Sequence, residues 1–337
     1  MTRFAMLAAG AAALTSLAAA AVAGPDARQA SGAVLPPPRA EAPAPAPVLS
    51  PGEIAAQAPA ADWIAIAADD LLVMDLAPGA RGQARRVVIQ LMPPPFAVPW
   101  VANIRTLAAA HWWDGLSVVR VQDNYVAQWG DPDGETPARA RPLPPALRPT
   151  SDAPYQLRGD APGWQRFAGL TIPRGTPAGY TAFEAGWPVA AEGTPDHAAR
   201  WPVHCYGMVG VGRNLAPDRG TGAELYAVIG HAPRHLDRNI ALVGRVVEGI
   251  EHLSSLPRGT GPLGFYADPA ERVAIRQVRL ASALPAAERP RLEYLSTDSA
   301  AFLRYAEARA NRRDAFFNLP AGGADICNIP VPVRRAR

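Results

Sequence analysis

The stretch VVRVQDNYVAQWGDP, residues 118–132, places an arginine between valines. Two short runs of valine and other strand-forming residues flank turn-forming residues, which is typical of a β-hairpin. With a three-residue loop at 123–125, Arg120 lies directly across from Gln128 on one face of the sheet. A two-residue loop would instead place Arg120 opposite Ala127. The residues alone leave both registers open.

The alternation of the hairpin decides what Arg120 faces. In the three-residue register Val126 shares the face of Gln128, whereas Val119 and Val121 point to the other side. Asn124 tolerates the left-handed backbone that such a loop requires. A charge buried without a partner is costly, so Arg120 either pairs with Gln128 in solvent or lies in a site that needs a permanent cation.

The sequence contains no other recognisable catalytic motif. The sequence has no Gly-x-Ser-x-Gly, P-loop or His-Glu-x-x-His motif. His231 and His235 lie four apart, but Pro233 between them argues against the helix that a shared metal would need. We therefore expect neither a metal nor a cofactor.

Composition excludes a further class of protein. The chain has 337 residues, is 49% hydrophobic and 19% charged, and carries a net charge of +3. Every basic residue other than histidine is arginine, and the arginines are scattered along the chain. A nucleic-acid-binding protein would cluster them, so we expect no nucleic-acid partner.

The first residues resemble a signal peptide. Arg3 precedes an alanine- and leucine-rich stretch that ends in Ala21-Val22-Ala23, a small-x-small cleavage pattern. We expect cleavage after Ala23 and a periplasmic or secreted protein without stable membrane insertion; an uncleaved anchor is the alternative. Residues 24–60 are rich in proline and alanine and are predicted to form a disordered tether.

Export gives the two cysteines a possible role. Cys205 and Cys327 would meet an oxidising compartment, where such a pair can form a disulfide. The spacing does not establish that the two Cα atoms are close, so two buried free thiols are the alternative.

The remaining pattern predicts many short strands and few helices. Strands are predicted within 62–76, 84–93, 204–213, 222–231, 239–247 and 271–282. One helix begins near Pro99, with Val101, Ile104 and Ala108 on one face, and a second covers 246–256. Residues 134–203 are too long for an ordinary loop and read as a functional insertion or a structured one that packs its aromatic residues. Such an order favours an antiparallel β-barrel with helical plugs over a βαβ repeat.

Three blocks in the same order resemble the cyclophilin family. VVRVQDNYVAQWGDP is similar to the family signature, VANIRTL to its first helix, and GMVGVGRN through GRVVEGI to its second half. The resemblance implies a mainly β, closed eight-stranded antiparallel barrel with two capping helices over 61–283. Residues 134–203 are then a long loop insertion. Residues 284–337 lie outside the resemblance; their pattern TDSAAFLRYAEARANRR predicts a helix, so we expect a partly helical C-terminal extension.

The resemblance also implies an activity and a site. Cyclophilins are peptidyl-prolyl cis/trans isomerases, and their partners are proline-containing polypeptides. Arg120 matches the catalytic arginine, and Gln128 matches the residue that positions it. Further matches imply substrate binding by Tyr125, Val126, Gly212, Glu224, Tyr226, His235 and Leu236, of which Tyr125, Val126, Tyr226 and Leu236 surround the proline ring.

Several of these positions depart from the family pattern. The family usually has phenylalanine at Tyr125 and Tyr226, and glutamine at Glu224. A carboxylate near Arg120 would weaken its field, and a hydroxyl on Tyr226 makes the pocket less apolar unless it is hydrogen-bonded. The leading hypothesis is a prolyl isomerase for exported proteins; the alternative is a weakly active or inactive module that binds peptides or proteins.

Overall fold

The structure, a computed structural model, describes residues 48–158, 179–192 and 199–336. All of them belong to one of the two units of the chain, Pro47–Arg337. The predicted signal peptide, residues 24–47 of the predicted tether, and Trp164 and Phe167 of the insertion lie outside the described residues.

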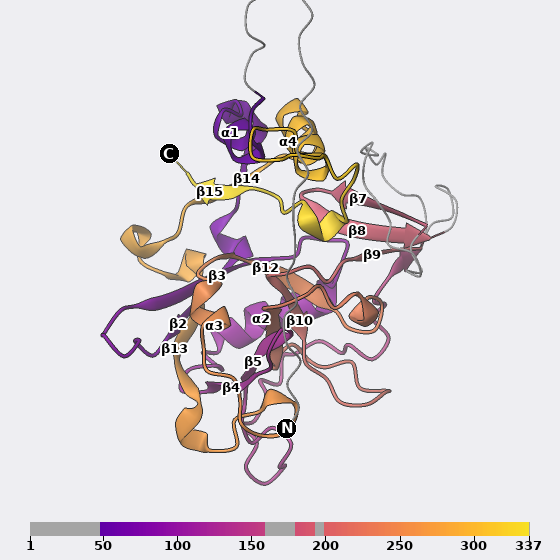
Figure 1. The fold of residues 1–337 in the computed structure, drawn as a ribbon. Coiled ribbons are helices and arrows are strands. Elements are labelled where there is room, and N and C mark those ends of the chain that lie inside the picture. The colour runs from indigo at the N-terminus through magenta and orange to yellow at the C-terminus, as the bar shows by residue number, and fades with distance from the viewer. Residues whose placement is uncertain (1–47, 159–178, 193–198, 337) are drawn as a thin grey trace, which may run out of the picture. The chain divides into compact units, whose positions relative to one another are not determined.

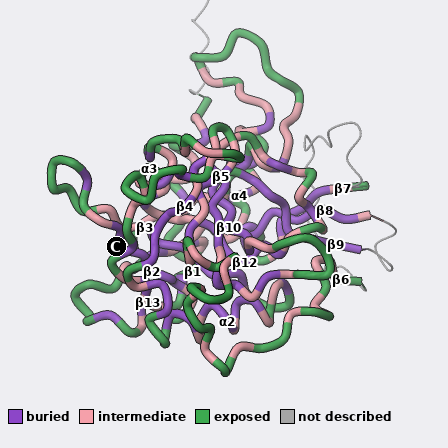
Figure 2. The backbone as a smooth tube through the Cα atoms, turned by 90° about the horizontal axis from the view of Figure 1, so that it is seen from below, coloured by how far each residue is buried: buried purple, intermediate pink, exposed green. Residues whose placement is uncertain are grey.

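Eight antiparallel strands close into a barrel, which confirms the predicted fold class (Figure 1). They pair in the order β10-β11-β5-β4-β13-β2-β3-β12, and β12 pairs in turn with β10. Figure 2 shows that these strands are mostly buried, whereas the loops around them are exposed. The strands are β2 (Leu71–Leu76), β3 (Arg85–Leu91), β4 (Ser117–Val121), β5 (Val126–Gly130), β10 (Met208–Val211), β11 (Leu225–Val228), β12 (Leu242–Glu248) and β13 (Val273–Leu280).

Helix α2 (Val98–Ala109) is the predicted first capping helix, and it has a proline in its first turn. Val101, Ile104 and Ala108 are buried in the main hydrophobic core, as their spacing predicts. The helix supplies Trp100 as well, whose indole N–H donates to the carbonyl of Gly220 at 3.0 Å. These contacts fix the helix against the loop that precedes β11.

The second capping helix is much shorter than predicted. Residues 246–248 continue β12 and pair with β3, so helix α3 covers only Glu251–Ser254. Gly249 separates the two elements with a positive φ of 85°, and a Cβ there would lie 2.1 Å from the carbonyl oxygen of Arg86. The close approach of β3 therefore favours strand pairing where the apolar spacing suggested a helix.

Order begins earlier than the predicted tether boundary at residue 60. Helix α1 (Pro51–Ala56) starts with a capping box: Ser50 and Glu53 bond each other's backbone N–H groups. Pro51 is buried, and α1 packs against α4 (Ala300–Ala310) of the C-terminal extension. The Ser-Pro-Gly-Glu sequence is a helix start that the surrounding proline-rich composition obscured.

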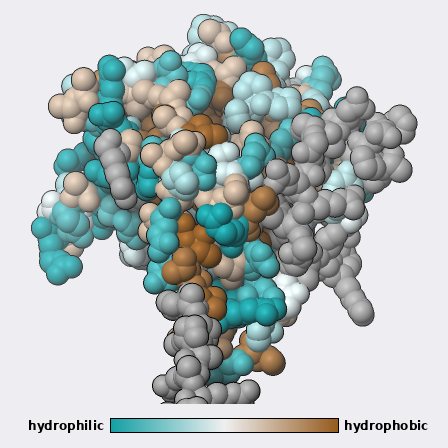
Figure 3. All heavy atoms as spheres, turned by 90° about the horizontal axis from the view of Figure 1, so that it is seen from above, coloured by the Kyte–Doolittle hydropathy of each residue, from teal (hydrophilic) through white to brown (hydrophobic). Residues whose placement is uncertain are grey.

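The C-terminal extension is folded and includes a small sheet. Strand β14 (Leu292–Leu295) lies between β1 (Trp63–Ala65) and β15 (Val333–Arg335). Seen from the side of α1 and α4, the surface mixes hydrophilic and hydrophobic side chains (Figure 3). After α4, Phe316 and Leu319 are 83% and 82% exposed.

The insertion carries structure of its own. It contains β6 (Leu157–Arg158), β7 (Tyr180–Glu184), β8 (Trp187–Glu192) and β9 (Ala199–Pro202), which pair in the order β6-β9-β8-β7. Phe183 packs edge-on against Phe302 of α4, with ring centroids 5.0 Å apart.

Buried Arg245 of β12 connects the barrel to the added parts. Its guanidinium lies 4.6 Å from the ring of Trp187 and 5.6 Å from that of Tyr294. It also donates to the carbonyl of Gly186 and to the side chain of Gln90. Barrel, insertion and C-terminal extension therefore meet at one side chain.

Candidate active site

The hairpin of β4 and β5 has the three-residue loop. Arg120 pairs with Gln128, and Val121 with Ala127. Asn124 adopts the left-handed conformation, with φ of 49°. Of the two registers that the sequence left open, the structure adopts the one that sets Arg120 opposite Gln128.

A β-bulge changes which side chains join Arg120. The register shifts between Val118 and Arg120, so Val119 is an extra residue in β4. Val119 lines the same groove as Arg120, whereas Val121 is part of the main core. The prediction that both valines face away from Arg120 is therefore wrong for Val119, because a bulge interrupts the alternation of a strand.

Three hydrogen bonds hold the guanidinium of Arg120. Its Nε–H donates to the carbonyl of Leu263 at 2.7 Å, and Nη1 donates to Gln128 Oε1 at 3.2 Å. Nη2 donates to the side-chain oxygen of Gln122. Gln128 thus accepts a hydrogen bond from Arg120, the residue opposite it in the hairpin.

Two aromatic rings lie close to this guanidinium. The guanidinium carbon of Arg120 is 5.6 Å from the centroid of Tyr125 and 5.3 Å from that of Phe265. Burial lowers the pKa of Arg120, but an arginine starts so high that it keeps its charge at neutral pH. The site therefore holds a fixed cation at the edge of an apolar surface.

The loop 259–266 completes the surroundings of Arg120. The N–H of Gly259 donates to the carbonyl of Val121 at 2.9 Å, and that of Tyr266 to the carbonyl of Val119 at 3.0 Å. The sequence reasoning missed this loop. Its only signal is a glycine- and proline-rich stretch, and that composition alone does not show which strand it contacts.

Arg120 lies in a groove of about 750 Å³. Beside it, β5, β11 and the segment after β11 form an apolar cluster, which we call the proline pocket after the ring that the resemblance predicts for it. The cluster consists of Val126, Tyr226 and Val228, with Tyr125, Leu236 and Ile240 packed against them. The four residues predicted to surround a proline ring are therefore together.

The other predicted binding residues lie near this pocket in different ways. Gly212 lines the groove, and its N–H donates to the carbonyl of Glu224 at 2.8 Å. A Cβ at Gly212 would be 2.8 Å from the Cβ of Glu224, so the close approach needs glycine. His235 is exposed and stacks on Tyr125, with ring centroids 6.1 Å apart.

Gln128 links Glu224 to Arg120, because it lies within hydrogen-bond distance of both. The amide of Gln128, which accepts from Arg120, lies 3.4 Å from the carboxyl of Glu224. Burial raises the pKa of Glu224 to about 7, although hydrogen bonds from Gln128 and the backbone of Asp131 lower it. At neutral pH this carboxyl is therefore divided between its acid and its anion.

The hydroxyl of Tyr226 is satisfied. It lies 2.9 Å from Nε2 of His204, and burial raises the pKa of the phenol well above its ordinary value. The tyrosine therefore stays neutral and adds no unpaired polar atom to the proline pocket.

The two cysteines form a disulfide. Cys205 and Cys327 are 122 residues apart and their Cα atoms are separated by 5.0 Å. The bond joins the segment before β10 to the C-terminal extension.

In the part of the chain that the structure describes, no group of three or more His, Cys, Asp or Glu residues is arranged to hold a metal ion.

A family model described as cyclophilin type peptidyl-prolyl cis-trans isomerase/CLD matches residues 86–280. The chain belongs to this family. The match includes α2, the Arg120 hairpin and every strand of the barrel except β2, which lies before it. The enzyme class is therefore a peptidyl-prolyl cis-trans isomerase, and proline-containing peptides are the ligands of the family.

The fold agrees with that of one solved cyclophilin. The chain is similar to cyclophilin AquaCyp293 from Hirschia baltica, with a TM-score of 0.55 and 21% identity over 82% of this chain and 94% of that one. A cyclophilin type isomerase from Cryptosporidium parvum gives a TM-score of 0.35 and 12% identity, over 63% of this chain and 96% of the other. A search of curated proteins gives no match.

Within the described ranges, no helix has the length and apolar character of a membrane span.

Proposed function

We propose that this cyclophilin catalyses cis/trans isomerisation of Xaa-Pro bonds in exported proteins, with Arg120 stabilising the twisted amide. The observation that supports the proposal best is the position of the Arg120 guanidinium, beside the proline pocket and bonded to Gln128. No covalent or proton-transfer step is required of the other residues.

The chemistry follows from the amide itself. Rotation about the Xaa-Pro bond crosses a barrier of roughly 18–20 kcal/mol, because the twisted amide loses its resonance. The prolyl nitrogen then regains a lone pair, which a guanidinium N–H can bond. A group that bonds the nitrogen only in the twisted state lowers the barrier.

Arg120 has donors to spare for this task. A guanidinium has five N–H donors. Its hydrogen bonds to described residues use three of them, at Leu263, Gln128 and Gln122. Two donors are left for a substrate, enough for the prolyl nitrogen and the neighbouring carbonyl oxygen.

The proposal of exported clients rests on different support. The first 23 residues have the pattern of a signal peptide, and a disulfide is typical of an oxidising compartment. Cell fractionation followed by N-terminal sequencing of the mature protein tests it. A periplasmic or secreted protein that begins at Gly24 is expected; an uncleaved cytoplasmic protein would contradict it.

Glu224 favours a second candidate, a peptide-binding module with little activity. An anion beside Gln128 opposes the field of Arg120. Catalysed exchange of a proline tetrapeptide by the intact chain and by Arg120→Ala separates the two functions. The isomerase accelerates exchange only with Arg120 present, whereas the module binds peptide without accelerating exchange.

A further inference from the structure

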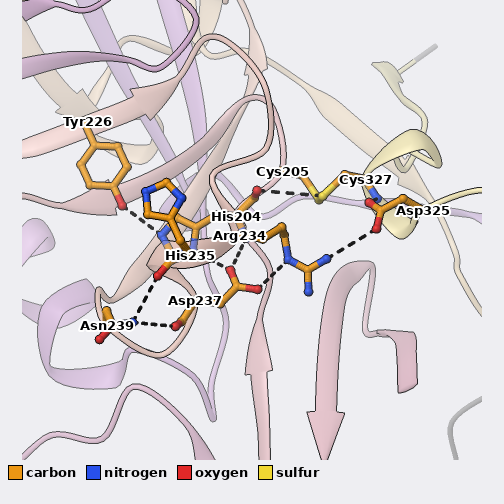
Figure 4. A network of polar contacts seen from close by, with 9 residues as sticks. All are labelled: His204, Cys205, Tyr226, Arg234, His235, Asp237, Asn239, Asp325 and Cys327. Atoms are coloured by element: carbon orange, nitrogen blue, oxygen red, sulfur yellow. Dashed lines mark hydrogen bonds and ion pairs between the residues drawn. A yellow bond between two sulfur atoms is a disulfide. The ribbon is translucent and has the colours of Figure 1, made fainter. Parts of the chain in front are cut away.

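A chain of buried hydrogen bonds runs outward from the proline pocket (Figure 4). The Tyr226 hydroxyl lies 2.9 Å from His204 Nε2, and His204 Nδ1 lies 2.9 Å from Asp237 Oδ1. The three residues are 4%, 1% and 6% exposed. The sequence patterns that indicated the site assigned no role to His204 or Asp237.

The surroundings of Asp237 determine the direction of these bonds. Its carboxyl accepts from the backbone N–H of His204 at 3.0 Å and from Arg234 Nε at 2.6 Å. Burial alone would raise the pKa of Asp237, but the hydrogen bonds of His204 and the charge of Arg234 outweigh it and lower the pKa. Because Asp237 is a carboxylate, His204 Nδ1–H donates to it; in the tautomer that carries this single ring proton, Nε2 is the acceptor for the Tyr226 hydroxyl.

The backbone leaves room for this hydroxyl. A Cβ at Gly210 would lie 2.3 Å from the hydroxyl oxygen of Tyr226, so the neighbouring strand must carry glycine there. The rings of His204 and Tyr226 stack, with centroids 6.4 Å apart and planes 13° from parallel. Gly210 therefore leaves space for the Tyr226 hydroxyl, and His204 provides its hydrogen-bond partner.

The outer end of this hydrogen-bond chain, at Arg234, lies against the C-terminal extension. Arg234 Nη1 lies 3.6 Å from Asp325 Oδ2. Cys205, next to His204, is bonded to Cys327, two residues after Asp325. Figure 4 shows Arg234 between the two aspartates, beside the disulfide.

We propose that His204 is a positioning residue of the proline pocket: by accepting the hydroxyl of Tyr226, it holds that ring as the pocket floor, and Asp237 orients it. The inference rests on the proposed function, since it concerns how that site receives proline. His204 does not touch the groove, so its effect passes through Tyr226. Without the acceptor, a buried hydroxyl without a partner would draw the ring toward the groove.

Asparagine and glutamine at position 204 separate the two bonds of the histidine. The short amide of His204→Asn can still donate to Asp237 but cannot reach Tyr226, whereas the longer amide of His204→Gln can offer its oxygen to the hydroxyl. The double variant His204→Asn with Tyr226→Phe has no hydroxyl left to satisfy. His111→Asn is the matched control, because that side chain is 59% exposed and lies in the turn after α2.

Each variant is titrated with an Ala-Pro tetrapeptide by NMR, and exchange rates and thermal unfolding are measured in parallel. We expect His204→Asn to lose affinity about tenfold, as an unpaired buried hydroxyl implies. The exchange rate of the bound peptide should stay near that of the wild type, because the Tyr226 ring contacts the proline equally in the ground state and in the transition state of the peptide. His204→Gln should retain most of the affinity, the double variant should bind like Tyr226→Phe alone, and His111→Asn should match the wild type.

The outcomes distinguish the two proposals. Wild-type affinity in a folded His204→Asn overturns the inference, and so does a double variant that binds tenfold more weakly than Tyr226→Phe. If His204→Asn does not fold, the comparison of the double variant with Tyr226→Phe decides. A wild type that binds peptide without accelerating exchange refutes the proposed catalysis and leaves the binding test of His204 intact. A wild type that does not bind peptide refutes both.

Discussion

The largely buried carboxyl of Glu224 leads to a prediction about stability. Its pKa is raised from 4.5 to about 7 by burial. Below pH 4.5 the group is protonated in the folded and the unfolded chain, and stability is unaffected. As the pH rises toward 7, the unfolded chain loses the proton and the folded chain holds it, so the free energy of unfolding falls with pH.

The size of the effect follows from the two pKa values. At about 1.4 kcal/mol for each unit of pKa, the ionised carboxyl costs the folded state about 3 kcal/mol above pH 7. Glu224→Gln removes the titration and keeps the shape of the side chain. The variant should therefore be more stable than the wild type by about 1 kcal/mol at pH 5 and about 3 kcal/mol at pH 8.5.

Urea unfolding of both proteins at the two pH values measures this difference, and changes common to both cancel. Glu307→Gln is the control, because Glu307 of α4 is exposed; its stability difference from wild type should stay nearly constant between the two pH values. A Glu224→Gln variant whose advantage stays constant between pH 5 and 8.5 would refute the reasoning, because the buried group would not titrate in this range.

Three further outcomes are expected. Cys327→Ser opens a loop of 122 residues and should lower the free energy of unfolding by roughly 2–5 kcal/mol in urea titrations; an unchanged midpoint would contradict a constraining role. Gly264→Ala places a side chain at φ of 79°, with its Cβ 2.7 Å from the Cα of Gln122. Because this displaces the loop that bonds Arg120, peptide exchange should slow about tenfold, a loss of about 1.4 kcal/mol in transition-state binding; wild-type exchange would contradict the role of the loop. Ser50→Ala should lower the thermal midpoint through loss of the α1 cap, worth about 1 kcal/mol, and an unchanged midpoint would show that α1 adds no stability.

The elements that the sequence predicts best are those whose local pattern agrees with their packing. The spacing of Val101, Ile104 and Ala108 marks the face of α2 that the core buries. Asn124 supports the three-residue loop that sets Arg120 across from Gln128. In both places the short-range signal and the tertiary contacts favour the same structure.

Other features depend on contacts between distant segments. The bulge at Val119 has no residue-type signal, although it decides which valine reaches the groove. Strand pairing with β3 overrides the helical spacing of Val246 and Ile250. The partner of Tyr226 could be suspected only from the presence of a hydroxyl in an apolar pocket, because His204 is 22 residues away in the sequence.

The central claim is that Arg120 catalyses prolyl isomerisation. Exchange NMR of a proline tetrapeptide tests it most directly, with the wild type, Arg120→Ala and Arg120→Lys compared at equal concentration. Uncatalysed exchange takes tens of seconds or longer, so weak catalysis is measurable. The account predicts acceleration by the wild type, its loss in Arg120→Ala, and at most a small remainder in Arg120→Lys, whose ammonium lacks the planar fork. Acceleration that persists in a folded Arg120→Ala, or its absence from the wild type, would contradict the claim.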